Sequence, residues 1–227
     1  MAATQRIIDL RNLLAERFQQ PPALTGGQIK VPLLERIPEA GLRKGAITEI
    51  ISPNPSAGSA LLIHSLLQIA QRDRFFLALI DGSDSFDIYD SGALQHLLWV
   101  RCEKASEALK AADFLLRDGN FPLVILDLGL NAPEELRNIP QTNWYRLQRL
   151  AEAVPSACLV MNRHSMVGSA QLKIVLENSW TLESMKRKDA VSKLRFRIER
   201  SHVGRDIALR CIASATAPRG PFLATAS

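Results

Sequence analysis

The chain has 227 residues, of which 47% are hydrophobic, and it carries 28 Lys and Arg residues against 23 Asp and Glu residues. This length and apolar content suffice for one sizeable hydrophobic core, so we expect a single main domain with terminal appendages. No run of apolar residues approaches the roughly 18 that a membrane-spanning helix needs, and the first residues lack the pattern of a secretory signal. Three cysteines, each in or beside an apolar run, indicate reduced core thiols and a cytoplasmic location.

The chain divides into three expected parts: an N-terminal helix and linker (1–27), a core domain (28–213) and a flexible tail (214–227). Within residues 5–18 the apolar side chains recur every three or four positions, which predicts an amphipathic helix. The residues of this stripe are Ile7, Leu10, Leu14 and Phe18. Prolines 21 and 22 and glycines 26 and 27 separate the helix from the rest. The stripe therefore packs either on the chain's own domain or on a partner, and we favour the partner.

Residues 45–67 have the layout of a phosphate-binding loop, because a β-rich run (46–51) enters a turn that leaves as an apolar helix. Such a loop needs glycines whose N–H groups close on phosphate, a Lys for the charge and a Ser or Thr for Mg²⁺. Here the prolines remove N–H donors, and Gly58 stands where the Lys would be. The loop reads Ser52, Pro53, Asn54, Pro55, Ser56, Ala57, Gly58 and Ser59. It has the shape of a phosphate loop without the cation.

From residue 45 onward apolar runs alternate with helical patterns, which predicts a mostly parallel sheet flanked by helices, an α/β fold. The expected strands are 46–51, 75–80, 97–101, 123–128 and 157–161, and the expected helices are 60–71, 103–117 and about 144–153. The stretch 173–188 can extend the sheet. These near-continuous apolar strands suit a sheet that is covered on both faces.

The C-terminal part has the strongest local charge. Between Lys186 and Arg210 nine basic residues face three acidic ones, a net charge of +6. Residues 194–200 alternate apolar and charged side chains, and with residues 206–212 they predict an antiparallel hairpin at the edge of the sheet. The solvent-exposed, basic face of this hairpin can bind the phosphates of DNA or an acidic protein surface. Alternatively, it is simply solvated. The candidate DNA contacts are Arg195, Arg197, Arg200 and Arg205.

The order of these pieces resembles the core of RecA-type recombinases. The residues that carry the resemblance are 42–50 (LRKGAITEI), 76–81 (FLALID), 123–127 (LVILD) and 159–162 (LVMN), and it covers about residues 42–210. The short chain, isolated helix and basic end are more similar to the ImuA family of accessory proteins. This resemblance implies a role in the SOS response and translesion synthesis beside a Y-family-like polymerase homologue, with a RecA-type recombinase or a second copy as further partners.

The departures from the RecA pattern concern ATP turnover. Ser83 stands where these enzymes place a catalytic Glu, although Asp81 before it is kept, and Ser cannot act as that base. The metal-side carboxylate survives as Asp127, and Arg163 replaces the sensor Gln. The DNA-gripping loop is shortened to 164–171. Together with the missing Lys, these losses predict a protein that is not an enzyme and has no cofactor.

Three functions compete: an adapter in a translesion-synthesis assembly, an ATPase in which Arg43, Lys44 or Arg163 supplies the missing charge, and a simple DNA-binding module. The losses favour the adapter. The four histidines (64, 96, 164 and 202) lack metal-ligand spacing, so we predict no metal site. The acidic loop 83–90 is expected to be solvated rather than to hold a cation.

Overall fold

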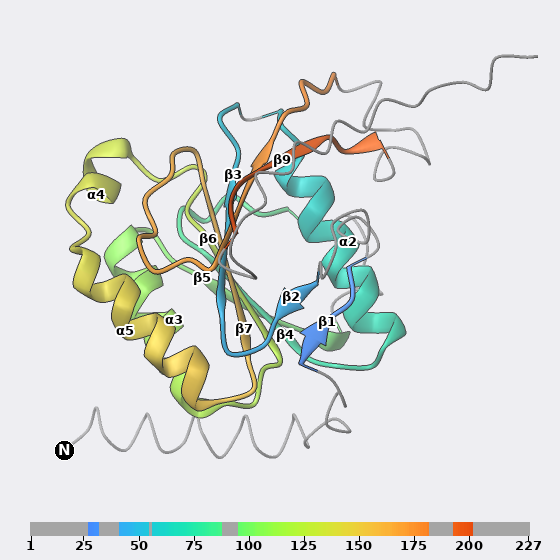
Figure 1. Cartoon of the computed structure of the whole chain (residues 1–227), viewed down its shortest axis with the longest axis vertical. Helices are drawn as coiled ribbons and strands as arrows, with labels where there is room; N and C mark the ends of the chain where they lie inside the picture. Colours follow the sequence, from blue (N-terminus) through green and yellow to red (C-terminus); the bar gives the residue numbers. More distant parts are fainter. Residues whose placement is uncertain (1–26, 32–40, 55, 88–94, 182–192, 202–227) are drawn as a thin grey trace, which may run out of the picture.

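In the computed structural model, residues 27–31, 41–54, 56–87, 95–181 and 193–201 are described. Their centre is a seven-stranded sheet in which all neighbouring strands are parallel except the last two, β8 and β9 (Figure 1). In sheet order the strands are β5 (Leu97–Arg101), β4 (Leu77–Asp81), β6 (Leu123–Asp127), β7 (Ala157–Asn162), β3 (Ile47–Ile51), β8 (Leu172–Leu176) and β9 (Phe196–Ser201). This arrangement confirms the expected α/β fold with a mostly parallel sheet.

Helices cover both faces of the sheet. One face carries α2 (Ser59–Arg72) together with a small antiparallel pair, β1 (Gln28–Ile29) and β2 (Leu42–Arg43) (Figure 1). The other face carries α3 (Ala105–Asp118), α4 (Pro133–Arg137) and α5 (Gln141–Ala153). The core is accordingly split into two apolar clusters, one on each side of the sheet.

The central strands are buried on both faces, as their apolar sequences predict. Every residue of β3, β4, β7 and β8 is buried. Helix α5 adds the fully buried Trp144 to the second cluster, and Cys102 and Cys158 are buried free thiols. Among the described residues, no helix is long and apolar enough to span a membrane.

The five strands and three helices expected from the sequence are all present, with ends that differ by at most a few residues. Helix α4 and strands β1 and β2 were not predicted from the sequence, because elements of five and two residues give no periodic pattern. Helix α4 could have been recognised from Pro133, since proline is favoured in the first turn of a helix.

The basic alternation at the C-terminal edge is confirmed for β9. Leu194 and Phe196 are buried, whereas Arg195 is exposed. Strand β9 pairs antiparallel with β8 at the edge of the sheet. The second half of the predicted hairpin (206–212), Arg205, the N-terminal helix with Ile7, Leu10, Leu14 and Phe18, and the tail all lie outside the described residues. The three-part division of the chain stays a prediction.

Candidate functional site at the carboxyl edge of the sheet

The phosphate loop lies between the carboxyl end of β3 and the first turn of α2. Ser52 is anchored by its N–H to the Asn162 carbonyl at 2.7 Å, and the Ala57 N–H reaches the Asn54 carbonyl at 3.0 Å. Gly58 precedes the helix with φ 109°, a left-handed conformation that favours glycine. Pro55 lies outside the described residues. The chain therefore folds this segment as the expected strand, loop and helix.

Protein side chains fill the space beside Gly58. A Cβ atom built at this glycine would overlap Leu194 Cδ2 and lie 3.1 Å from Trp180 Nε1. The backbone N–H of Trp180 donates to the Ser56 carbonyl at 3.0 Å, and both Ala57 and Leu194 are fully buried. A phosphate that approached this turn would meet an indole and a leucine side chain. The turn at Ala57 and Gly58 thus packs against the apolar core on the α2 side, whereas Pro53 and Asn54 are exposed.

The carboxylate of Asp81, at the end of β4, accepts hydrogen bonds from the loop that follows this strand. Its Oδ2 accepts the Phe86 N–H at 2.7 Å, and its Oδ1 accepts the Ser83 N–H at 3.3 Å. Only 1% of Asp81 is exposed. Ser83, which replaces the catalytic Glu, donates its hydroxyl to Ser85 at 3.0 Å. These contacts hold the turn together. The Ser83 hydroxyl, which stands where the resemblance places the catalytic Glu, is hydrogen-bonded to Ser85.

Asp127 ends the neighbouring strand β6, directly beside Asp81 in the register. Its Oδ1 accepts the Gly129 N–H at 2.9 Å. Burial raises the pKa of Asp127 to about 6; the Gly129 hydrogen bond lowers this pKa, and the charge of Asp81 raises it further. The carboxylate is where the resemblance places a metal-side ligand. Among the described residues, no group of three or more His, Cys, Asp or Glu side chains is arranged to hold a metal ion.

Asn162 and Arg163, at the sensor position, are turned toward neighbouring protein groups. The Asn162 Nδ2 donates to Glu49 Oε1 at 3.0 Å, and Arg163 Nε donates to the Gly129 carbonyl at 2.8 Å. Arg163 therefore lies at the carboxyl edge, whereas Arg43 and Lys44 precede the amino end of β3. A five-residue strand spans about 16 Å, so these two side chains lie at the opposite edge from the phosphate loop.

A buried ion pair that the sequence analysis did not identify fixes the crossover loop, residues 163–171 between β7 and β8. Glu49 is fully buried in β3, and its Oε2 lies 2.7 Å from Lys173 Nζ in β8. Its Oε1 accepts the N–H groups of Met166 at 2.7 Å and Val167 at 3.0 Å. Lys173 Nζ also lies 2.7 Å from Ser165 Oγ. One carboxylate thus orders the segment that stands where the resemblance places the DNA-gripping loop.

The basic face of β9 is partly neutralised. Arg197 Nε donates to Glu177 Oε1 at 3.3 Å, with both side chains about half exposed. Arg195 is exposed, and the side chain of Arg200 lies outside the described part of β9. Arg195 thus directly precedes β9 and Arg197 lies within this edge strand. Arg195 also follows Leu194, whose side chain lies against Gly58.

The remaining candidates have structural partners. His64 contacts Gln68 at 3.0 Å and His96 stacks on Phe76 with ring centroids 5.4 Å apart. In the acidic loop, Arg101 forms a bidentate pair with Asp84, and this hydrogen bond lowers the pKa of Asp84. In the described part of that loop, Asp84 and Asp87 are exposed; the absence of a bound cation stays a prediction.

The fold and this edge define a class: an α/β domain consistent with a RecA-like fold, in which Leu194 and Trp180 lie against Gly58 of the loop between β3 and α2. No model of a known protein family matches the chain.

Among curated proteins, the chain is similar over 91 residues, 38% of its length, to the Protein RecA of Mycoplasmopsis pulmonis (30% identical), of Chlorobaculum tepidum (30%) and of Clavibacter michiganensis subsp. michiganensis (33%). The chain spans only about a quarter of the length of these relatives (26%, 26% and 25%). This similarity supports a RecA-like superfamily relationship.

Proposed function

We propose that this protein is a non-catalytic, RecA-like accessory protein of DNA repair, an adapter in a DNA-damage-induced translesion-synthesis complex of the cytoplasm. Its partners would be a Y-family-like polymerase homologue and a RecA-type recombinase or a second copy. The observation that carries the absence of turnover is the filled phosphate loop, where Leu194 and Trp180 lie against Gly58. The similarity to RecA proteins supports the link to DNA repair, and the resemblance of the short chain, the predicted N-terminal helix and the basic end to the ImuA family supports the link to translesion synthesis.

The geometry also weighs against an ATPase with displaced residues. Arg43 and Lys44 lie at the amino edge of the sheet and cannot reach phosphates bound at the opposite edge. Arg163 is at the correct edge, but its guanidinium donates to the Gly129 carbonyl. Asp127 has a raised pKa, so at neutral pH its carboxylate is less firmly ionised than an ordinary metal ligand.

Titration calorimetry with Mg·ATP and a hydrolysis assay test the proposal. We expect no saturable heat and no turnover, since losing a charged contact to phosphate removes on the order of 1.5 to 3 kcal/mol of binding free energy. Micromolar affinity would contradict the proposal. So would hydrolysis that the substitution Asp127→Ala abolishes, because a contaminating ATPase would not respond to that change.

The adapter role of the N-terminal segment has its own test. A helix of about 14 residues is marginal alone, so its stripe must be buried somewhere. We expect Leu10→Asp with Leu14→Asp to abolish partner or self-association while the melting temperature of the isolated protein is kept. An unfolded double variant, caused by burying unpaired carboxylates in a core, would end this role for the stripe.

A DNA-binding module is the second candidate, supported by the exposed Arg195 and its neighbour Arg197 on β9. If these side chains contact phosphates, DNA affinity should fall steeply as salt is raised. The absence of DNA binding at low salt would assign this face to solvent or to an acidic protein.

A further inference from the structure

The outer surface of α5 carries three exposed side chains that no part of the proposed nucleotide or DNA site uses: Tyr145, Arg146 and Arg149, here called the α5 ridge. Tyr145 is 55% exposed, and only Leu130 is a comparably exposed large hydrophobic residue in the described part of the chain. Tyrosine and arginine are the residue types enriched among the dominant contacts of protein interfaces. The ridge therefore has the side chains of an interface centre.

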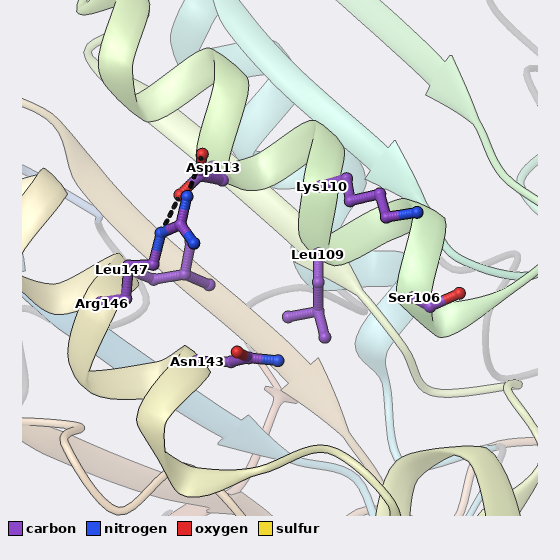
Figure 2. A pocket seen from close by; sticks show the side chains of 7 residues that line it. All are labelled: Ser106, Leu109, Lys110, Asp113, Asn143, Arg146 and Leu147. Atoms are coloured by element: carbon purple, nitrogen blue, oxygen red, sulfur yellow. Dashed lines mark hydrogen bonds and ion pairs between the residues drawn. The ribbon is translucent and has the colours of Figure 1, made fainter.

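A hollow of about 340 Å³ flanks one side of the ridge, between α3 and α5. Figure 2 shows Leu109 pointing from α3 toward Asn143, with Lys110 and Ser106 on one side and the Arg146–Asp113 pair on the other. Leu109 and Leu147 are 9% and 2% exposed, so the floor is apolar and the rim is charged. Such a hollow accommodates an apolar side chain that has polar neighbours.

A second hollow of about 380 Å³ lies on the other side of α5, between Tyr145, Arg149 and Glu152 and residues 168–171 of the crossover loop. Its loop wall is fixed from within. Gln141 accepts the Gly168 N–H at 3.1 Å and donates to the Met166 carbonyl at 2.9 Å, in addition to the bonds that Glu49 receives. A wall held in this way is preformed, which lowers the entropy cost of binding.

The basic side chains around the ridge favour a partner that carries negative charge. Lys110 and Arg149 have no ion-pair partner within the described ranges. Arg146 shares Asp113 with Arg117, at 2.7 and 2.8 Å respectively. The first hollow has two cations, Lys110 and Arg146, against Asp113, whereas the second has one of each, Arg149 and Glu152. Over the two hollows together cations are in excess, and carboxylates of a partner would find complementary charge there.

The same surface is less suited to nucleic acid. Each hollow holds a carboxylate, Asp113 in one and Glu152 in the other. A backbone with a phosphate at every unit would bring charge to these positions, whereas a protein segment can place an uncharged side chain there. The floor formed by Leu109 and Leu147 offers burial to an aliphatic side chain. A protein segment that alternates carboxylates with apolar side chains fits both features.

We propose that the α5 ridge and its two flanking hollows are a docking surface for an acidic protein segment that carries apolar side chains, with Tyr145 as the central contact. This inference rests on the proposed adapter function and gives that function a partner-binding face separate from the N-terminal stripe.

Fluorescence anisotropy with a short labelled peptide composed of glutamate and leucine tests the surface, with the matched lysine and leucine peptide and a single-stranded oligothymidylate as comparison probes. We expect saturable binding of the acidic peptide alone. Tyr145→Ala and Arg149→Glu should each weaken it about tenfold or more. Arg137→Glu on α4 makes the same change of charge outside both hollows and should leave the affinity unchanged. All three side chains are exposed, so the variants should keep the wild-type melting temperature.

Several results would overturn the proposal. These are the absence of saturable acidic-peptide binding, an equal loss in Arg137→Glu, and tighter binding of oligothymidylate. A dimer in sedimentation that Tyr145→Ala disperses would make a second copy the occupant, and tighter peptide binding in Leu10→Asp would make the chain's own N-terminal segment the occupant. Mg·ATP turnover, measured separately, would end the proposed function while peptide binding at the ridge could still be observed.

Discussion

Two loops at the carboxyl edge of the same sheet are held in opposite ways. The phosphate loop, after β3, packs its Gly58 against the side chains of Leu194 and Trp180, with no charged group among the nearest atoms. The crossover loop, after β7, is held by the buried carboxylate of Glu49 and its ion pair with Lys173. Apolar packing tolerates changes that conserve volume, whereas a buried charge that loses its partner is strongly destabilising. The two loops should therefore respond very differently to substitution.

The largest effect is expected at Glu49. Glu49→Ala leaves Lys173 buried without a counter-charge and three donors without an acceptor, so we expect unfolding free energy to fall by about 3 to 5 kcal/mol. Urea denaturation measures the loss. Asp84→Ala, which breaks the exposed pair with Arg101, is the matched control and should cost far less, because water screens an exposed ion pair. If both variants lose equally little, the crossover loop is not held by the buried pair.

Asp127, at the end of β6 and next to β7 in the sheet, should show a pH-dependent effect of opposite sign. Because its pKa is raised from 3.8 to about 6, the folded state binds its proton more tightly than the unfolded state, and stability falls as pH rises from about 4 to 6. Asp127→Asn should therefore raise the unfolding free energy by about 3 kcal/mol above pH 7 and have little effect below pH 4.

Thermal unfolding as a function of pH measures this difference. Asp84→Asn is the matched control, since the pKa of Asp84 is lowered by its hydrogen bond with Arg101 and that variant should lose stability above pH 4. A flat difference between Asp127→Asn and wild type across pH would show that burial does not perturb this carboxyl.

A smaller loss is expected at the phosphate loop. Gly58→Ala places a Cβ against Leu194 at a left-handed position, which should cost about 1 to 3 kcal/mol. Gly27→Ala, where a Cβ meets no atom within 4 Å, should be nearly neutral. Adding Leu194→Ala to Gly58→Ala should cost less than the sum of the two single changes, because the overlap is relieved. Additive losses would place Leu194 away from the loop.

Much of this fold could be predicted from the sequence, because the near-continuous apolar strands and the loop residues around Gly58 are local signals. The filling of the loop could not, since Trp180 and Leu194 approach it from segments far along the chain. Glu49 and Lys173 each interrupt an apolar strand, and two opposite charges in two buried strands were a signal that could have been used. Their pairing depends on β3 and β8 being neighbours in the sheet, and the sequence of the two strands does not specify that order.

The smallest effect on stability is expected at β9, the edge strand that begins shortly after Leu194. Arg195→Ala with Arg197→Ala removes one half-exposed ion pair, so unfolding free energy should change by less than about 1 kcal/mol. If the strand contacts DNA, the same variant should flatten the dependence of DNA affinity on salt by about 0.9 in logarithmic slope for each lost duplex contact. An unchanged slope would exclude these side chains from phosphate binding.

The filled loop has a consequence for how the protein would respond to the state of the cell. A protein that binds nucleotide only when folded gains stability as the nucleotide concentration rises. Leu194 and Trp180 are covalently part of the chain, so the contact with Gly58 is present at a fixed effective concentration in every molecule. The folded population would then be independent of the energy charge, and assembly would follow the amount of protein synthesised.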